Sequence, residues 1–175
     1  MPKLIITISG LTGAGKTTLG KVVAKRLNIR HIWKTHKVFS GKRKVVEFTK
    51  NLPVSFEKNF DNNTMMEAEK QDCVVTTWLG PWLIKNPTVR VLVYADLDSR
   101  INRKEREMGI SAREAKRYVV EKDKLNKIRF KSIYGIDLDD HSGFDLLLNT
   151  SKLNTNQCAD IVIFLTQEKA KKIFK

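Results

Sequence analysis

The chain has 175 residues, of which 41% are hydrophobic and 30% are charged, a balance that excludes a disordered chain and predicts one soluble globular domain. No apolar run is long enough to span a bilayer, and no secretory signal is apparent, so we expect a cytoplasmic protein. The net charge of +14 predicts anionic partners, without choosing among nucleotides, nucleic acid and membrane surfaces.

The first predicted strand covers residues 4–9 and runs directly into a glycine-rich turn. A helix is predicted from Lys16, because apolar residues recur downstream at the 3.6-residue spacing of one buried helix face. The turn between them, residues 10–17, reads GLTGAGKT and matches the pattern G-x-x-x-x-G-K-T in full. Because the match stands between a strand and a helix, we interpret it as a phosphate-binding loop and not as a chance glycine-rich turn.

Each part of this loop has an expected role in binding ATP and a magnesium ion. Glycines let successive backbone N–H groups turn inward, and the following helix adds its positive end. Lys16 is expected to reach the β and γ phosphates, and the Thr17 hydroxyl to complete the shell of Mg²⁺. The expected ATP-binding residues of the loop are Gly10, Thr12, Gly13, Ala14, Gly15, Lys16, Thr17 and Thr18.

Strand and helix patterns alternate along the rest of the chain. Apolar runs predict two clear strands and two weaker ones, at residues 73–75, 89–94, 144–148 and 161–165. Charged helices are predicted over residues 98–107 and from Ser111 to about residue 132, where Ser111 and Glu114 form a capping-box pattern. This alternation predicts an α/β protein of the three-layer P-loop NTPase type, with a parallel sheet flanked by helices and a helical lid.

Basic residues are concentrated in the two charged helices. Two sets each share one helix face, Arg100 with Arg103, and Lys122 with Asn126 and Arg129. A solvated hairpin with local ion pairs is the alternative interpretation. Since a kinase needs cations that cover the phosphoryl group during transfer, the loop upstream favours a lid.

Several stretches resemble archaeal-type cytidylate kinases, which are small nucleoside monophosphate kinases related to adenylate kinases. Residues 133–140 read IYGIDLDD, residues 144–151 read FDLLLNTS, and residues 6–10 read ITISG. The resemblance covers most of the chain and is strongest over residues 1–30 and 88–152. It implies transfer of the γ-phosphoryl group of ATP to a pyrimidine monophosphate, with magnesium.

The resemblance also implies roles for individual residues. Arg100 and Arg103 match the family's positions at the start of the lid, and Arg129 matches an arginine at its far end. On this basis Arg100 is expected to contact ATP, and Lys16, Arg103 and Arg129 are the expected catalytic residues. We expect one domain of three parts, a core (residues 1–30, 70–98 and 140–175), an acceptor-binding insert (31–69) and a lid (99–135).

The chain departs from the family pattern on the acceptor side. Residues 76–78 read TTW where the family has an acid, a glycine and an arginine that grips the acceptor phosphate, and Lys122 replaces a lid arginine. Lys34, Lys37 and Arg43 are expected to supply the missing charge, with Trp78 as a wall of the acceptor pocket.

The resulting hypothesis is an ATP-dependent nucleoside monophosphate kinase of the CMP or dCMP type, whose partners are ATP and a small acceptor. A kinase of another small acceptor is one alternative. A non-catalytic ATP-binding protein and an RNA-binding protein are two others, the last favoured by the charge but not by any recognition motif.

Overall fold

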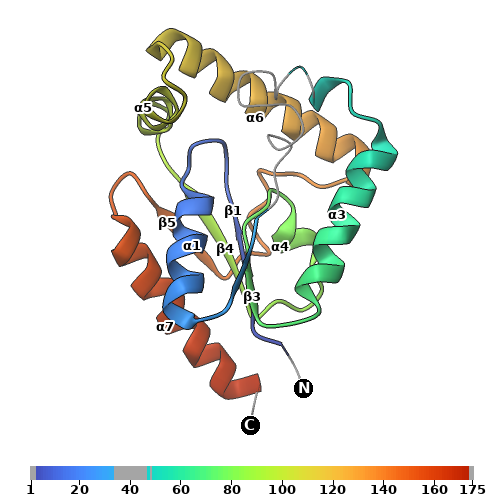
Figure 1. The fold of residues 1–175 in the computed structure, drawn as a ribbon, viewed down its shortest axis with the longest axis vertical. Coiled ribbons are helices and arrows are strands. Elements are labelled where there is room, and N and C mark those ends of the chain that lie inside the picture. Colours follow the sequence, from blue (N-terminus) through green and yellow to red (C-terminus); the bar gives the residue numbers. More distant parts are fainter. Residues whose placement is uncertain (1–2, 34–46, 48, 174–175) are drawn as a thin grey trace.

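The computed structural model describes residues 3–33, 47 and 49–173. Strands and helices alternate from β1 to α7 (Figure 1). The strands are β1 (Ile5–Ser9), β2 (Arg30–Ile32), β3 (Cys73–Val75), β4 (Val89–Tyr94) and β5 (Leu146–Asn149). The helices are α1 (Lys16–Leu27), α3 (Val54–Ala68), α4 (Gly80–Leu83), α5 (Leu97–Met108), α6 (Ala112–Tyr134) and α7 (Thr155–Ile173).

The strands form one parallel sheet in the order β2-β3-β1-β4-β5. β1 lies at the centre, where Ile6 pairs with Val74 of β3 and with Val89 of β4. Because all pairs are parallel, each strand reaches its neighbour by a crossover, and the loops after the strands gather at one edge of the sheet. The predicted α/β fold is confirmed.

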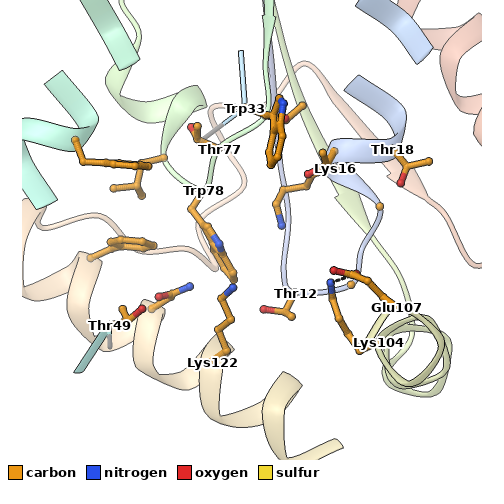
Figure 2. A pocket seen from close by; sticks show the side chains of 18 of the residues that line it. Thr12, Lys16, Thr18, Trp33, Thr49, Thr77, Trp78, Lys104, Glu107 and Lys122 are labelled. Atoms are coloured by element: carbon orange, nitrogen blue, oxygen red, sulfur yellow. Dashed lines mark hydrogen bonds and ion pairs between the residues drawn. The ribbon is translucent and has the colours of Figure 1, made fainter. Parts of the chain in front are cut away.

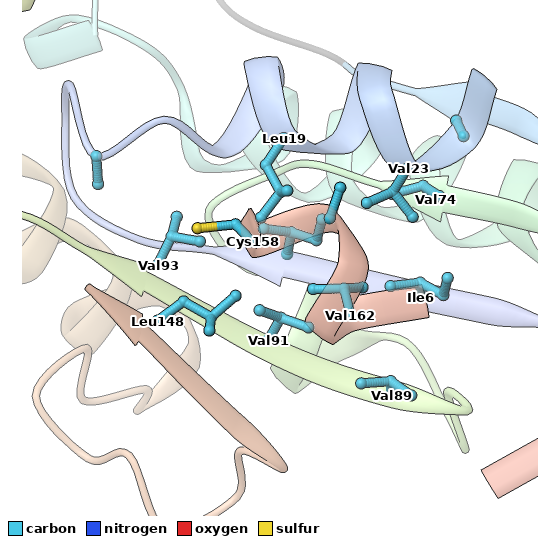
Figure 3. Packing of buried hydrophobic residues seen from close by; sticks show 14 residues of the cluster. Ile6, Leu19, Val23, Val74, Val89, Val91, Val93, Leu148, Cys158 and Val162 are labelled. Atoms are coloured by element: carbon cyan, nitrogen blue, oxygen red, sulfur yellow. The ribbon is translucent and has the colours of Figure 1, made fainter. Parts of the chain in front are cut away.

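Two helices cover one face of the sheet and enclose the main core. Val23 of α1 and Val162 of α7 pack against Ile6, Val91 and Val93 of the central strands, all of them fully buried (Figure 3). α3 and α4 lie on the other side of the sheet (Figure 1). α5 and α6 lie beyond the carboxyl ends of the strands, above the loop that follows β1 (Figure 1).

The ends of α5 and α6 follow from local chemistry. Asp96 caps α5 by accepting a hydrogen bond from the N–H of Ser99 at 2.7 Å, and the predicted capping box of Ser111 and Glu114 is present at the start of α6. Both helices end at glycines in the left-handed region, Gly109 (φ 63°) and Gly135 (φ 70°). These caps fix where the two charged helices begin and end.

One predicted strand is wrong. Residues 161–165 belong to α7, where Cys158, Val162 and Thr166 are buried while Phe164 is exposed. That spacing is helical, and a short apolar run cannot by itself distinguish a strand from a buried helix segment. The strand predicted at residues 144–148 is displaced to Leu146–Asn149, and β2 was not predicted.

Cys73 and Cys158 are both buried, and neither forms a disulfide. Within the described ranges, none of the helices combines the length and the apolar character that crossing a bilayer requires.

Candidate active site

The loop of residues 10–17, called the phosphate loop from here on, connects β1 to α1. Its backbone has the positive φ that favours glycine at Gly10, Gly13 and Gly15, and at the first two a side chain would also collide with a carbonyl group. A Cβ at Gly10 (φ 151°) would lie 2.1 Å from the carbonyl oxygen of Val93, and one at Gly13 (φ 80°) would lie 2.9 Å from that of Arg100. No side chain caps the first turn of α1, so its N–H groups are available to an anion.

Side chains bind the phosphate loop through its carbonyl groups. Lys16 Nζ donates to the carbonyl oxygens of Gly10 and Leu11. The remaining bonds are from Arg100 to Thr12 at 3.2 Å, from Arg103 to Gly13 at 3.1 Å and from the Thr150 hydroxyl to Ala14 at 2.9 Å. The carbonyl groups of residues 10–14 are therefore all engaged within the chain.

Positive charge gathers around Lys16. Burial is the main cause that lowers the pKa of the Lys16 ammonium to about 7, and the nearby charges of Lys122, Lys104 and Arg100 lower it further, against the opposing effect of Asp123. Lys16 Nζ also lies 4.7 Å from the centre of the Trp78 ring (Figure 2). A buried cation beside other cations fits a polyphosphate ligand, whose charge would compensate all of them.

The phosphate loop opens into a cavity of about 570 Å³, a volume typical of small-molecule sites. One half of the wall is the phosphate side, formed by Thr12, Gly13, Gly15, Lys16, Thr17, Thr18, Arg103, Lys104, Glu107 and Lys122. The other half is aromatic and polar, formed by Trp33, Thr49, Glu57, Phe60, Asp61, Thr76, Thr77, Trp78, Leu79, Asn126 and Phe130. In Figure 2 Trp78, which belongs to the second half, lies close to Lys16 and Lys122 of the phosphate side, so the two halves meet at this ring.

The two arginines expected at the start of the lid occupy different places. Arg103 lines the cavity and donates to Gly13 and to both the hydroxyl and the carbonyl oxygen of Thr150. Arg100 is buried behind the loop, where it pairs with Asp123 at 2.5 Å. Asp123 in turn accepts a hydrogen bond from the N–H of Thr12 at 2.9 Å. Arg100 therefore fixes the loop to α6, and the described residues that line the cavity do not include it.

Arg129 lies away from the phosphate loop. Its guanidinium donates to Glu57 at 2.8 Å and to the carbonyl oxygen of Leu52 at 2.8 Å. Five residues further along α6, the Tyr134 hydroxyl donates to Asp61 at 2.6 Å. These two contacts tie α6 to α3, and among the described residues Arg129 is not part of the cavity wall.

The other predicted residues divide in two groups. Thr17, Thr18 and Trp78 line the cavity, as does the whole of residues 76–78 at the carboxyl end of β3. Lys34, Lys37 and Arg43 lie outside the described residues. The described part of the chain holds no cluster of histidine, cysteine and acidic residues suited to a metal, so Thr17 remains the candidate ligand on the protein.

Sequence reasoning missed Glu57 and Asp61. They share the buried face of α3 with Thr64 and Ala68 at helical spacing. The signal for these residues in the sequence was a set of mostly polar residues at the helical spacing that is usual for a buried apolar face. Burial raises the pKa of Asp61 to about 6, and Glu57 adds to this rise, although the hydrogen bond from Tyr134 opposes it.

Comparison with known proteins places the chain in a family. The sequence profile of the cytidylate kinase-like family matches residues 55–152. The chain is 32% identical over 157 residues to the cytidylate kinase of Pyrococcus horikoshii. This alignment covers 86% of this chain and 81% of the relative. The chain belongs to the cytidylate kinase-like family. The cytidylate kinase of Pyrobaculum aerophilum is also 32% identical, over 93% of this chain and 92% of its own length.

Solved structures agree with this cytidylate kinase-like family at the level of the fold. An uncharacterized protein from Eubacterium ventriosum superposes with a TM-score of 0.71, at 20% identity over 95% of this chain and 99% of the other. The shikimate kinase from Bacteroides thetaiotaomicron superposes with a TM-score of 0.56, at 20% identity over 96% and 98% of the two chains.

Proposed function

We propose that this chain is an ATP-dependent phosphotransferase that converts a nucleoside monophosphate of the CMP or dCMP type to the diphosphate. The observation that carries the proposal is that one cavity joins the phosphate loop to an aromatic and polar wall. A donor triphosphate on the loop and an acceptor against the wall would then face each other across Trp78. Membership of the cytidylate kinase-like family supports this assignment.

The chain's own residues would act by position and charge. Lys16, Arg103 and Lys122 line the phosphate side and would hold the phosphate oxygens in place. A magnesium ion held by the Thr17 hydroxyl, by phosphate oxygens and by water would supply further charge neutralisation. We assign α5 and α6 to a lid that excludes water, and Lys34, Lys37 and Arg43 to the acceptor phosphate.

A second candidate function rests on the end of β3. Thr76, Thr77 and Trp78 line the cavity there, and none of them carries the charge that would grip an acceptor phosphate. An acceptor without a phosphate, such as a nucleoside, would suit this wall. The second candidate is therefore a kinase of another small acceptor.

An ADP-release assay with magnesium and ATP tests both candidates. The acceptors are CMP, dCMP, UMP, AMP, GMP and the corresponding nucleosides, and Lys16→Met is the inactive control. We expect turnover with CMP and dCMP that falls by at least about 100-fold in the variant, because one phosphate-stabilising group is lost. Turnover with cytidine and not with CMP would select the second candidate. ATP binding without turnover on any acceptor would contradict both.

A further inference from the structure

The amide of Asn126 is a largely buried polar group in the cavity wall. Asn126 lies on α6, is only 4% exposed and lines the cavity. Within the described residues its side chain forms no hydrogen bond. Buried amide groups in folded proteins are almost always hydrogen-bonded. The position and the chemistry of this amide therefore indicate a ligand in the cavity.

Asp61 provides a second polar group on the same wall. It is 8% exposed and accepts a hydrogen bond from the Tyr134 hydroxyl at 2.6 Å through Oδ2. Its other oxygen, Oδ1, has no hydrogen bond among the described residues. An ionised carboxylate only accepts hydrogen bonds, whereas an amide both donates and accepts. Asp61 and Asn126 together thus offer two acceptors and one donor group.

Aromatic rings flank these two polar groups. The rings of Trp78 and Phe130 lie 6.1 Å apart at 53°, and Phe60 lines the same part of the cavity. Phe130 follows Asn126 by one helical turn on α6, and Phe60 precedes Asp61 on α3. Flat apolar walls with a few polar groups at the edge suit a planar heterocycle.

We propose that Asn126 and Asp61 determine acceptor specificity by reading the edge of a planar base that carries an exocyclic amine. The Asp61 carboxylate would accept from the amine, and the Asn126 amide would pair with the adjacent ring nitrogen or carbonyl group. Cytosine and adenine present an amine beside a ring acceptor, whereas uracil presents a carbonyl oxygen at the same place, which a carboxylate repels. The inference rests on the proposed function, and it names the group of the acceptor that is recognised.

Calorimetric titration of the full chain with CMP and UMP, in the absence of ATP, tests the inference without turnover. We expect wild-type protein to bind CMP about 10–100-fold more tightly than UMP, since a site built for an N–H donor disfavours ligands that lack it. Asn126→Ala should weaken CMP binding at least about tenfold. Asp61→Asn should remove most of the preference for CMP over UMP, because an amide can donate to the uracil carbonyl group.

Two controls separate recognition from loss of structure. Asn62→Ala removes an exposed amide next to Asp61 on α3, and it should leave both affinities unchanged. ATP affinity should stay within about twofold of wild type in all three variants, since their side chains lie away from the phosphate loop. If Asn126→Ala and Asp61→Asn bind CMP and UMP as wild type does while ATP binding is intact, the inference is wrong.

Failure of the proposed function would look different. Wild-type protein that binds ATP but neither CMP nor UMP would contradict the monophosphate acceptor alone. Titration with cytidine and uridine then tests the inference by itself. A preference for cytidine that Asp61→Asn abolishes supports it, and equal or undetectable binding of the two nucleosides overturns it.

Discussion

Lys16 is a cation placed where its charge is costly without a ligand. It is surrounded by Lys122, Lys104 and Arg100, and it rests over Trp78 while donating to the loop's own carbonyl groups. Burial and these charges lower its pKa to about 7. A bound triphosphate would raise that pKa again, because an opposite charge favours the protonated form.

ATP affinity should therefore depend on pH. Above about pH 7 the free protein carries mostly neutral Lys16, so ATP binding must take up a proton, and the binding constant should fall by up to about tenfold per pH unit. Calorimetric titration with ATP between about pH 7.5 and 9, where the γ-phosphate is already ionised, measures the binding constant. Repeating it in buffers of different ionisation enthalpy measures the number of protons taken up. Lys16→Met should bind weakly and without the pH dependence. Constant affinity with no proton uptake in wild type would contradict the role given to Lys16.

At the level of single residues, the sequence predicted the functional residues that belong to a motif with fixed spacing. Both glycines of the motif, Gly10 (φ 151°) and Gly15 (φ 96°), have the positive φ that favours glycine, whereas the need for Gly13 comes from its close approach to the carbonyl oxygen of Arg100, which the motif does not specify. The sequence could not predict toward which neighbours the side chains of Arg100 and Arg129 point. Each belongs to a helix whose rotation depends on distant partners, Asp123 for one and Glu57 for the other.

The contact between α3 and α6 is a buried ion pair joined to a hydrogen bond. Glu57 and Arg129 have side chains only 3% and 13% exposed, so each charge is largely removed from water. Breaking such a pair from one side is strongly destabilising, because it leaves the other charge buried without its opposite.

We expect Arg129→Met to lower the free energy of unfolding by about 2–4 kcal/mol. Urea denaturation measures this change, and the double variant Glu57→Gln, Arg129→Met should recover part of it. The control is Lys127→Met on the same helix, which breaks the exposed ion pair (2.7 Å) of Lys127 with Asp139 in the segment after α6 and should cost less than about 1 kcal/mol. Equal losses for Arg129→Met and Lys127→Met would show that α3 and α6 are not held together by this pair.

Elements with strong end signals were predicted well from the sequence. α5 and α6 have an Asp or Ser cap at one end and a glycine at the other, and both appear close to the predicted bounds. The strand prediction for residues 161–165 was wrong, because the apolar run in the middle of α7 resembles a buried strand when the flanking residues are not considered. α3 offered no apolar pattern, since its buried face contains Glu57 and Asp61 in place of apolar side chains, and only the helical spacing of these polar residues could have indicated it.

For the whole molecule, the alternation of strands and helices predicted a parallel sheet, but not the strand order. Order and register depend on contacts between residues far apart in the sequence, such as Ile6 with Val89. The net charge of +14 is also a property of the whole chain. Repulsion among these charges destabilises the compact state at low ionic strength.

The melting temperature of the protein without ligands should therefore rise with salt. Between about 0.02 and 0.3 M potassium chloride we expect an increase of a few degrees, because screening weakens the net repulsion more than it weakens individual surface pairs. Differential scanning calorimetry measures this increase. A melting temperature that falls over the same range would indicate that attractive ion pairs outweigh the excess charge.

The hydrogen bonds to the carbonyl groups of the phosphate loop affect the rate and the entropy of ATP binding. Because Lys16, Arg100, Arg103 and Thr150 already hold residues 10–14, the loop has lost its backbone freedom during folding. A phosphate chain that arrives would meet preorganised N–H groups and would not have to order the loop that binds it. Thr150, 136 residues distant from Ala14 along the chain, thus joins the nucleotide site to the last strand. Loosening the turn after β5 would slow the capture of ATP without removing any group that touches it.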